Sequence, residues 1–274
     1  MKMADSIDPT LFQINHIPIK KQSEQNAFAT WYDEKAKLEW KLQQFNQSMN
    51  CLRVTPKVLD QLLADGWRHF GSHFFRDIFN MYQGKVTRVL PLRIVIDQFK
   101  LAKDQKRILK KNQDLIIEYG PLNLTQAHFD LFEKHAVRFQ NPPDSLYTYF
   151  EKENSEISPS LIWSCCVYLK NGTQKDLIAA SYFDLGDEAL SSIFAIFDPA
   201  HDDRGLGTFT LLMEILFAQQ HQKKYVYTGY SYRVSSHYDY KKRYKGTEFY
   251  DYIGNWYPLE QFDQVPLKKH RYER

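Results

Sequence analysis

The segment Gly205-Leu206-Gly207 lies between an apolar, strand-like stretch and a helix-like stretch, and its residue types could do chemistry. Amide groups at a helix N-terminus are unpaired and point outward, so such a turn can hold a phosphate or another anionic oxygen. Glycine also lets a ligand approach the backbone closely. The alternative is that the turn only starts the helix. The pattern therefore indicates an anion-binding position whose meaning depends on the residues around it.

Acidic, phenolic and basic side chains lie on both sides of this turn. Asp198 ends the strand before it, and Tyr227 and Tyr230 lie on the strand expected after the helix. Tyr240 and Lys241 follow about one strand and one turn later. A carboxylate can orient an ammonium group, a phenol can relay a proton, and a lysine can bind a phosphate or an oxyanion. The alternatives are structural: Asp198 can cap the following turn, and the tyrosine rings can pack in a core.

Two basic segments could contact a polyanion. In the first, residues 98–113, the cations recur at helical intervals on one broad face and include Lys103, Lys106, Arg107 and Lys110. In the second, Lys242 and Arg243 alternate with tyrosines. Cations and rings in alternation suit the end of a single-stranded RNA, whose phosphates bind the cations and whose bases stack on the rings. A solvated helix face and an ordinary loop are the alternatives.

The elements expected around the glycine turn form an α+β pattern. An amphipathic helix is predicted over 125–140, followed by strands over 160–170, 176–186 and 189–199; an Asn-Gly turn joins the first two strands as a hairpin. The glycine turn, a helix over 208–222 and a strand over 224–232 complete the order. This order predicts a mostly antiparallel sheet with helices packed on it.

The first half of the chain is also mixed. Thr55 and Pro56 predict the start of a helix that Gly66 ends, strands follow over 67–84 and 88–96, and the basic helix leads to a strand over 114–120. Residues 22–48 are polar with scattered aromatic residues, which indicates a peripheral helix or an arm within residues 1–50.

Composition sets the limits on class and compartment. The 274 residues are 43% hydrophobic and 25% charged, which is typical of a soluble globular protein of one large or two small domains. A net charge of +3 neither demands nor excludes a polyanionic partner. The three cysteines have no metal-site spacing and no disulfide pattern. The sequence shows no signal peptide and no apolar run long enough for a membrane span, so we expect a cytoplasmic protein without a metal and without a membrane partner.

Residues 191–246 resemble the arginyl-tRNA–protein transferases and their bacterial relatives, the aspartate/glutamate leucyltransferases. The matching elements, in order, are Ser191-Ser192, Phe197-Asp198-Pro199, Leu206-Gly207, Tyr225 to Tyr227, Gly229-Tyr230 and Tyr240-Lys241. A looser likeness runs upstream and includes Trp67, Arg68 and Arg93, so that residues 50–257 are covered.

The resemblance implies a fold and a reaction. The fold would be a GNAT-like acyltransferase in residues 121–274, packed against a smaller GNAT-like α+β domain in residues 1–120. In the reaction, the α-amine of an acceptor protein or peptide attacks the ester carbonyl of an aminoacyl-tRNA charged with arginine or leucine, without a further cofactor. The enzyme must align amine and carbonyl, accept the ammonium proton and stabilise the oxyanion.

The resemblance also assigns roles to the candidate residues. The catalytic set would be Asp198, Tyr227, Tyr230, Tyr240 and Lys241. The set that binds substrate or tRNA would be Trp67, Arg68, Arg93, Lys103, Lys106, Arg107, Lys110, Gly205, Leu206, Gly207, Lys242 and Arg243. We expect the glycine turn and Tyr240-Lys241 to border one hollow.

The sequence departs from the related patterns in three places. Asp202 stands where GNAT enzymes carry a base or an amide before the glycine turn, which argues against coenzyme A as the acyl carrier. The cysteine cluster of eukaryotic relatives is absent. Ser235 to Tyr238 replace a Cys-Pro-Lys-Met stretch. The alternatives are therefore an acyl-CoA-dependent N-acyltransferase and a non-catalytic tRNA-binding relative.

Overall fold

The computed structural model describes residues 45–139, 142–154 and 156–263. Most of the arm predicted for residues 1–50 lies outside the described residues, but its last part forms a strand, β1 (Gln47–Asn50). This strand pairs with β3 (His73–Arg76), which pairs with β2 (Arg68–Phe70), in a small antiparallel sheet. Helix α2 (Pro56–Ala64) lies between β1 and β2 in the chain and begins as the sequence predicts, with the Thr55 hydroxyl accepting from the Val58 amide at 3.4 Å.

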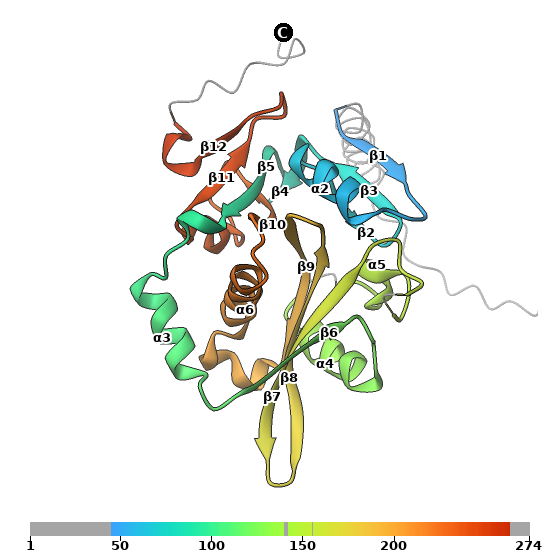
Figure 1. Cartoon of the computed structure of the whole chain (residues 1–274), viewed down its shortest axis with the longest axis vertical. Helices are drawn as coiled ribbons and strands as arrows, with labels where there is room; N and C mark the ends of the chain where they lie inside the picture. Colours follow the sequence, from blue (N-terminus) through green and yellow to red (C-terminus); the bar gives the residue numbers. More distant parts are fainter. Residues whose placement is uncertain (1–44, 140–141, 155, 264–274) are drawn as a thin grey trace, which may run out of the picture. The chain divides into compact units, whose positions relative to one another are not determined.

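The larger sheet has nine strands in the described part of the chain (Figure 1). Eight follow one another in the order β12-β11-β5-β10-β9-β8-β7-β6, and β4 pairs with β5 outside this path. The strands are β4 (Phe79–Tyr82), β5 (Lys85–Val95), β6 (Ile116–Pro121), β7 (Ile162–Asn171), β8 (Gln174–Leu185), β9 (Ala189–Phe197), β10 (Tyr225–Tyr232), β11 (Thr247–Tyr250) and β12 (Trp256–Pro258). The predicted α+β class is confirmed.

Strands β9 and β10 form the one parallel pair among the described strands, joined through η3 (Pro199–Arg204) and helix α6 (Leu206–Gln220). Their pairing is short and ends where Tyr227 lies opposite Ser191. Beyond that point β10 stays with β5, across a bulge between Tyr227 and Gly229, while β9 stays with β8. The two strands thus part in the middle of the sheet, in the strand–helix–strand arrangement that the GNAT-like resemblance implies.

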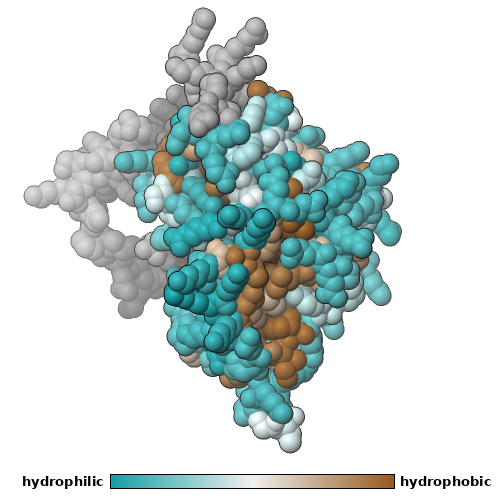
Figure 2. Space-filling view, turned by 60° about the vertical axis from the view of Figure 1, so that its left-hand side comes forward, coloured by the Kyte–Doolittle hydropathy of each residue, from teal (hydrophilic) through white to brown (hydrophobic). Residues whose placement is uncertain are grey.

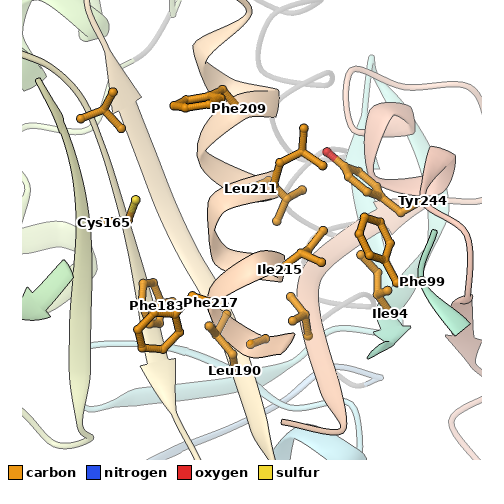
Figure 3. Close-up of a cluster of buried hydrophobic side chains, with 14 of the residues drawn as sticks. Ile94, Phe99, Cys165, Phe183, Leu190, Phe209, Leu211, Ile215, Phe217 and Tyr244 are labelled. Carbon is orange, nitrogen blue, oxygen red and sulfur yellow. The ribbon is translucent and has the colours of Figure 1, made fainter. Parts of the chain in front are cut away.

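Helix α6 packs on one face of the sheet. Phe209, Leu212 and Ile215 of the helix are buried against β5, β8 and β9, where Ile94 and Phe183 contribute to the same cluster (Figure 3). Burying each such side chain contributes about 1.5 to 3 kcal/mol. This cluster holds the helix against the sheet beside the place where β9 and β10 part.

The opposite face carries α4 (Gln126–Ala136) and α5 (Tyr147–Phe150). Leu131 and Phe150 pack there against Tyr182 of β8, whereas the next residue, Phe183, belongs to the α6 cluster. Successive side chains of a strand point to opposite faces, so β8 is covered on both sides. The order of helix, three strands, helix and strand that the sequence predicts is therefore confirmed.

The basic helix is shorter than predicted. Helix α3 spans Lys103–Lys111 rather than 98–113, and 96–98 form a separate 3₁₀ turn. It begins after Ala102, whose amide donates to Gln105 Oε1 at 2.9 Å, and ends at Asn112, whose side chain donates to the carbonyl oxygens of Ile108 and Arg204, both at 3.0 Å. The latter contact fixes the end of α3 beside the turn that leads into α6.

Strands from both sides of residue 120 share the large sheet, since β5 pairs with β10 and β11. The boundary between domains 1–120 and 121–274 stays a prediction. None of the helices in the described ranges combines the length and the apolar character that crossing a membrane requires.

Candidate active site

A cavity of about 750 Å³ opens where β9 and β10 part. Residues 192–195 of β9 and 228–230 of β10 line it, together with one face of α6 and the 3₁₀ turn η4 (Asp239–Arg243). Gly207 of the glycine turn and the pair Tyr240-Lys241 border this same cavity, as the sequence predicts they should. Three ionisable side chains meet at its inner end: Arg68, Glu214 and Lys241.

Glu214 is the only charged residue of α6 and is 1% exposed. Neither of its carboxylate oxygens has a hydrogen-bond partner among the described residues. Burial raises the pKa of Glu214 to about 8, although the Ser181 and Ser192 hydroxyls and the cations nearby act in the opposite direction. A buried carboxylate without a partner is costly, so its presence needs a functional explanation.

Arg68 reaches this place from β2 of the small sheet and is 8% exposed. Its Nη1 donates to Ser191 Oγ at 2.8 Å, and its Nη2 donates to the carbonyl oxygen of Ser192. These are the residues of β9 at which pairing with β10 stops. Burial lowers the pKa of Arg68, but a guanidinium stays protonated in proteins, so Arg68 is a fixed cation between the two strands.

Lys241 extends from η4 into the cavity. The residue is half-buried, and its Nζ lies 3.4 Å from the carbonyl oxygen of Tyr230. Burial, together with the Arg68 cation, lowers the pKa of Lys241 to about 7, and Glu214 opposes this. Near neutral pH a large share of Lys241 is therefore the free amine, which can accept a proton.

The bulge in β10 depends on a glycine. Gly229 has a φ of +91°, and a Cβ placed there would lie 3.1 Å from Lys241 Nζ and 3.4 Å from Arg68 Nη2. Glycine adopts such a φ without the strain that other residues suffer. It also leaves room for both cations against the backbone. Gly229 thus positions the two cations as well as the strand.

The walls of the cavity are aromatic. Tyr149 stacks on Phe194 with ring centroids 3.9 Å apart, and Phe70 meets Tyr149 edge to face at 5.0 Å. At another part of the lining, His135 lies against Phe197 at 4.7 Å. Such walls bind apolar groups and planar rings.

The structure brings five of the predicted site residues to the cavity lining: Arg68, Gly207, Tyr230, Tyr240 and Lys241. The Tyr230 hydroxyl donates to the carbonyl oxygen of Gly66 at 2.9 Å, so it is already engaged. Tyr240 is exposed at the rim.

Asp198 and Tyr227 are not part of this lining. The Asp198 carboxylate accepts from the Ala200 amide at 2.9 Å and pairs with Lys134 at 2.8 Å, which is the capping alternative. Tyr227 packs against Trp256 in the cluster beneath α2, where burial raises its pKa to about 12. Their catalytic roles stay predictions.

The other predicted binding residues outside the lining have structural contacts. Arg93 pairs with Glu248 at 2.7 Å and lies over the Tyr225 and Trp256 rings. Trp67 is covered by the Arg76 guanidinium. Leu206 is fully buried, and Gly205 has a φ of +65° as it starts α6. Lys242 pairs with Asp239 at 2.8 Å, and Arg243 is exposed.

The basic face of α3 is open to solvent. The four residues of α3 that are predicted to bind tRNA are exposed and make no ion pair with any described residue: Lys103, Lys106, Arg107 and Lys110. The neighbouring Lys111 pairs with Asp203 at 3.0 Å, and Arg204 forms two bonds with Asp114, both at 2.9 Å. In Figure 2, which turns the α3 side forward, hydrophilic residues cover much of this face beside a hydrophobic band.

Sequence reasoning missed Glu214. One signal was present, because Glu214 is the single charge in a 15-residue helix that is otherwise apolar or uncharged. A helix that is apolar all round is buried, so its lone carboxylate had to be buried too.

No group of three or more His, Cys, Asp or Glu side chains in the described ranges could hold a metal ion. Cys165 and Cys166 are buried and free, and Cys51 is free at the surface of the α2 cluster. The absence of a metal and of any cofactor stays a prediction.

Comparison with known proteins points to one family. The family model described as arginine-tRNA-protein transferase, C terminus, matches residues 127–251. The aspartate/glutamate leucyltransferase of Marinobacter nauticus is 28% identical over 201 residues, which cover 71% of this chain and 80% of that protein. That of Leptospira interrogans is 28% identical over 221 residues, covering 77% and 82%.

Among solved structures, the crystal structure of FemX aligns with a TM-score of 0.46 at 9% identity, over 89% of this chain and 79% of that one. The sequence matches span α4 to the end of β11, which includes β9, α6, β10 and η4 around the cavity. The chain is therefore similar over residues 127–251 to the C-terminal part of the arginine-tRNA-protein transferases, and over more than two thirds of its length to the aspartate/glutamate leucyltransferases.

Proposed function

We propose that this protein transfers an aminoacyl group from a charged tRNA to the α-amine at the N-terminus of an acceptor protein or peptide. One observation carries the proposal: Arg68, Glu214 and Lys241 converge at the inner end of a cavity between two parting strands. An amine and an ester carbonyl need to be aligned there, deprotonated and stabilised, and these three groups supply what that requires.

The proton balance of the reaction fits Lys241. The free amine of Lys241 takes a proton from the acceptor ammonium, and the resulting neutral α-amine attacks the ester carbonyl carbon. The protonated Lys241 then stabilises the oxyanion of the tetrahedral intermediate. When the ester C–O bond breaks, Lys241 passes this proton to the departing ribose oxygen, and the attacking nitrogen, which still carries two hydrogens, releases one of them to solvent. The products are free tRNA and a neutral peptide bond.

In this scheme Glu214 adjusts the pKa of Lys241 so that the lysine can both accept and release a proton. Burial and the Arg68 cation both lower the pKa of Lys241, so without an opposing group Lys241 would take up a proton less readily. In its ionised form Glu214 opposes this and raises the pKa of Lys241, which favours uptake of the proton from the acceptor ammonium. Glu214 therefore acts as a positioning residue for the charge of Lys241.

The names of the two relatives indicate which amino acid is transferred and which N-terminal residue accepts it. Both are called aspartate/glutamate leucyltransferases, so we propose leucine as the transferred residue and Asp or Glu as the first residue of the acceptor. The acidic side chain would bind Arg68, whose guanidinium has further N–H donors beyond those on Ser191 and Ser192. The aromatic walls suit a leucyl side chain better than an arginyl one.

The tRNA would follow the basic face of α3. Four exposed cations that pair with no described acid lie along one face of α3, and the end of α3 is bonded to the turn that starts α6. The helix face of α6 that follows this turn lines the cavity through Gly207 and Glu214. A cytoplasmic site of action and the absence of a cofactor beyond the charged tRNA are part of this proposal.

An acyl-CoA donor is less suited to the structure. Its pyrophosphate would meet Asp202 and Asp203 at the start of α6, both exposed acids. Asp202 pairs with Arg138 at 2.7 Å and Asp203 with Lys111, so the nearby cations are already engaged.

The experiment incubates the protein with tRNA charged with labelled leucine or labelled arginine and with peptides that begin with Asp, Glu or Ala. Label on the Asp and Glu peptides from leucyl-tRNA is expected. Label transferred only from acetyl-CoA would overturn the proposal. Binding of charged tRNA without transfer to any peptide would instead identify a non-catalytic relative.

A further inference from the structure

Asp77 places a second, unused carboxylate on the cavity wall. It lies between β3 and β4, is half-buried and lines the cavity together with Phe75 and Tyr230. Its backbone is fixed: the Asp77 amide donates to the Tyr230 hydroxyl at 3.4 Å, and the Tyr252 hydroxyl donates to the Asp77 carbonyl oxygen. The side chain makes no hydrogen bond and no ion pair with any described residue.

Three described acids outside the cavity lining are paired with cations or with a histidine. Asp198 pairs with Lys134, Asp202 with Arg138 and Asp184 with His69. Glu214 shares its surroundings with Arg68 and Lys241. Burial raises the pKa of Asp77, and among the described residues His73 partly offsets this rise. A partly desolvated carboxylate with no cation of its own binds an incoming ammonium strongly.

Tyr230 relates this carboxylate to the reacting groups. Its backbone oxygen faces Lys241 Nζ at 3.4 Å, and its hydroxyl lies against the Asp77 amide. Lys241 and Asp77 therefore stand at opposite ends of one tyrosine, on the same cavity. The cavity has a cationic end and an anionic end.

The proposed reaction involves two amino groups with opposite needs. The acceptor α-amine must lose its proton before it attacks, and a cation beside it favours the neutral form. The α-amino group of the aminoacyl ester must stay out of the reaction, and a carboxylate beside it favours the protonated, non-nucleophilic form. A cavity with one cationic and one anionic end can bind the acceptor α-amine at the first end and the α-amino group of the aminoacyl ester at the second.

We propose that Asp77 binds the α-ammonium of the aminoacyl group on the donor tRNA and turns its ester carbonyl toward Lys241. This inference rests on the proposed function. It makes Asp77 a donor-binding residue that recognises the feature shared by every aminoacyl-tRNA, independent of its side chain. The acceptor amine then approaches from the end that carries Arg68 and Lys241.

The test compares two donors, leucyl-tRNA and the same tRNA carrying the analogue in which a hydroxyl replaces the α-ammonium. Charge-assisted hydrogen bonds contribute about 1.5 to 3 kcal/mol, so the wild-type protein should prefer leucyl-tRNA by roughly 10- to 100-fold in kcat/KM. In Asp77→Asn this preference should fall to within about 3-fold, mainly through a raised KM for leucyl-tRNA. Asp77→Glu, which keeps the charge, should recover part of it.

Asp97→Asn serves as the matched control, since Asp97 is exposed and lies outside the cavity lining. It should behave as the wild type toward both donors. An unchanged donor preference in Asp77→Asn would overturn the inference, and so would a raised KM for the acceptor peptide alone, which would assign Asp77 to the acceptor. Failure of the wild-type protein to use any charged tRNA would instead overturn the proposed function.

Discussion

Two buried charged clusters begin at adjacent residues of β2, and only one of them opens onto a cavity. Arg68 points to Glu214 and Lys241 at the parting of β9 and β10. His69 points the other way: its Nε2 lies 2.9 Å from Asp184 Oδ2 and its Nδ1 lies 2.9 Å from the carbonyl oxygen of Gly71. The second Asp184 oxygen accepts from Ser160 Oγ at 2.7 Å.

The two clusters differ in bonding rather than in burial. Every polar atom of the His69 side chain has a partner, and the pair is sealed from the cavity. Among the described residues, Glu214 has no hydrogen-bond partner and Lys241 has one weak partner. A satisfied buried pair stabilises a fold, whereas an unsatisfied one beside a cavity keeps its bonding capacity for a substrate. Charge and burial alone therefore do not identify the active site.

The largest expected effect concerns the cluster that opens onto the cavity, which consists of Arg68, Glu214 and Lys241 (the open cluster). Lys241→Met should lower kcat for aminoacyl transfer by about 10³-fold, because proton transfer by a positioned side chain contributes about 10² to 10⁴. In the wild-type protein kcat/KM should rise as the pH rises through about 7, where Lys241 loses its proton. The measurement is the initial rate of label transfer between pH 6 and 9.

Lys245→Met is the matched control, since Lys245 is exposed and lies outside the cavity lining. It should transfer at close to the wild-type rate. A Lys241→Met protein that kept full activity would remove Lys241 from the mechanism.

The second prediction concerns the buried pair of His69 and Asp184, where we expect an effect on stability rather than on transfer. Asp184→Asn leaves His69 buried without its counter-charge, and breaking such a pair costs about 3 to 5 kcal/mol. Burial by itself would lower the pKa of His69, but Asp184 outweighs burial and raises it. A raised folded-state pKa gives stability that is complete below the unfolded value of about 6.5 and is lost as the pH rises through the folded value.

The free energy of unfolding in urea, measured from pH 5.5 to 9, checks this. The difference in the free energy of unfolding between wild type and Asp184→Asn should be largest near pH 5.5 and should become smaller as the pH rises. A gap that widened with rising pH would mean that His69 is neutral in the folded protein and that the two clusters differ in another way.

Glu214→Gln sets the same kind of substitution in the open cluster. Removing an unpartnered buried carboxylate should leave the free energy of unfolding unchanged or raise it, because the amide has less to lose on desolvation. Transfer should fall by roughly 10²-fold, since Lys241 then lacks the neighbouring acid that raises its pKa. Thermal unfolding and transfer rates on one preparation separate the two effects. A stability loss as large as that of Asp184→Asn would place Glu214 among the structural pairs.

The sequence was sufficient for most elements and for part of the site. The Thr55 cap, the hairpin between β7 and β8 and the turn before α6 follow from local patterns, and each forms as expected. Arg68 and Lys241 were selected by family likeness, and both line the cavity. Local signals and a long motif therefore locate the site approximately.

What sequence reasoning missed depends on tertiary structure. The sequence favours a catalytic role for Asp198 because it ends a central strand. In the structure its oxygens accept from the Ala200 amide and from Lys134, outside the cavity lining, and the catalytic role stays a prediction. Glu214 faces a cavity that opens where β9 and β10 part after Ser191, and Asp77 reaches it from the segment between β3 and β4. No local pattern encodes where two distant strands stop pairing. The sequence alone therefore does not reveal which of these charged residues line the cavity.

The smallest expected effect extends the comparison from buried charges to exposed ones. Lys106→Glu combined with Lys110→Glu reverses two cations on the open face of α3 and should weaken tRNA binding about 10-fold. Each lost phosphate contact lowers the dependence of log affinity on log salt by about 0.7 to 0.9, so the slope should flatten by about 1.5. Lys152→Glu with Lys170→Glu makes the same charge change at exposed positions away from α3 and should change neither slope nor transfer. Equal slopes for the two double variants would show that tRNA follows another surface, while the roles of Arg68, Glu214 and Lys241 would stand.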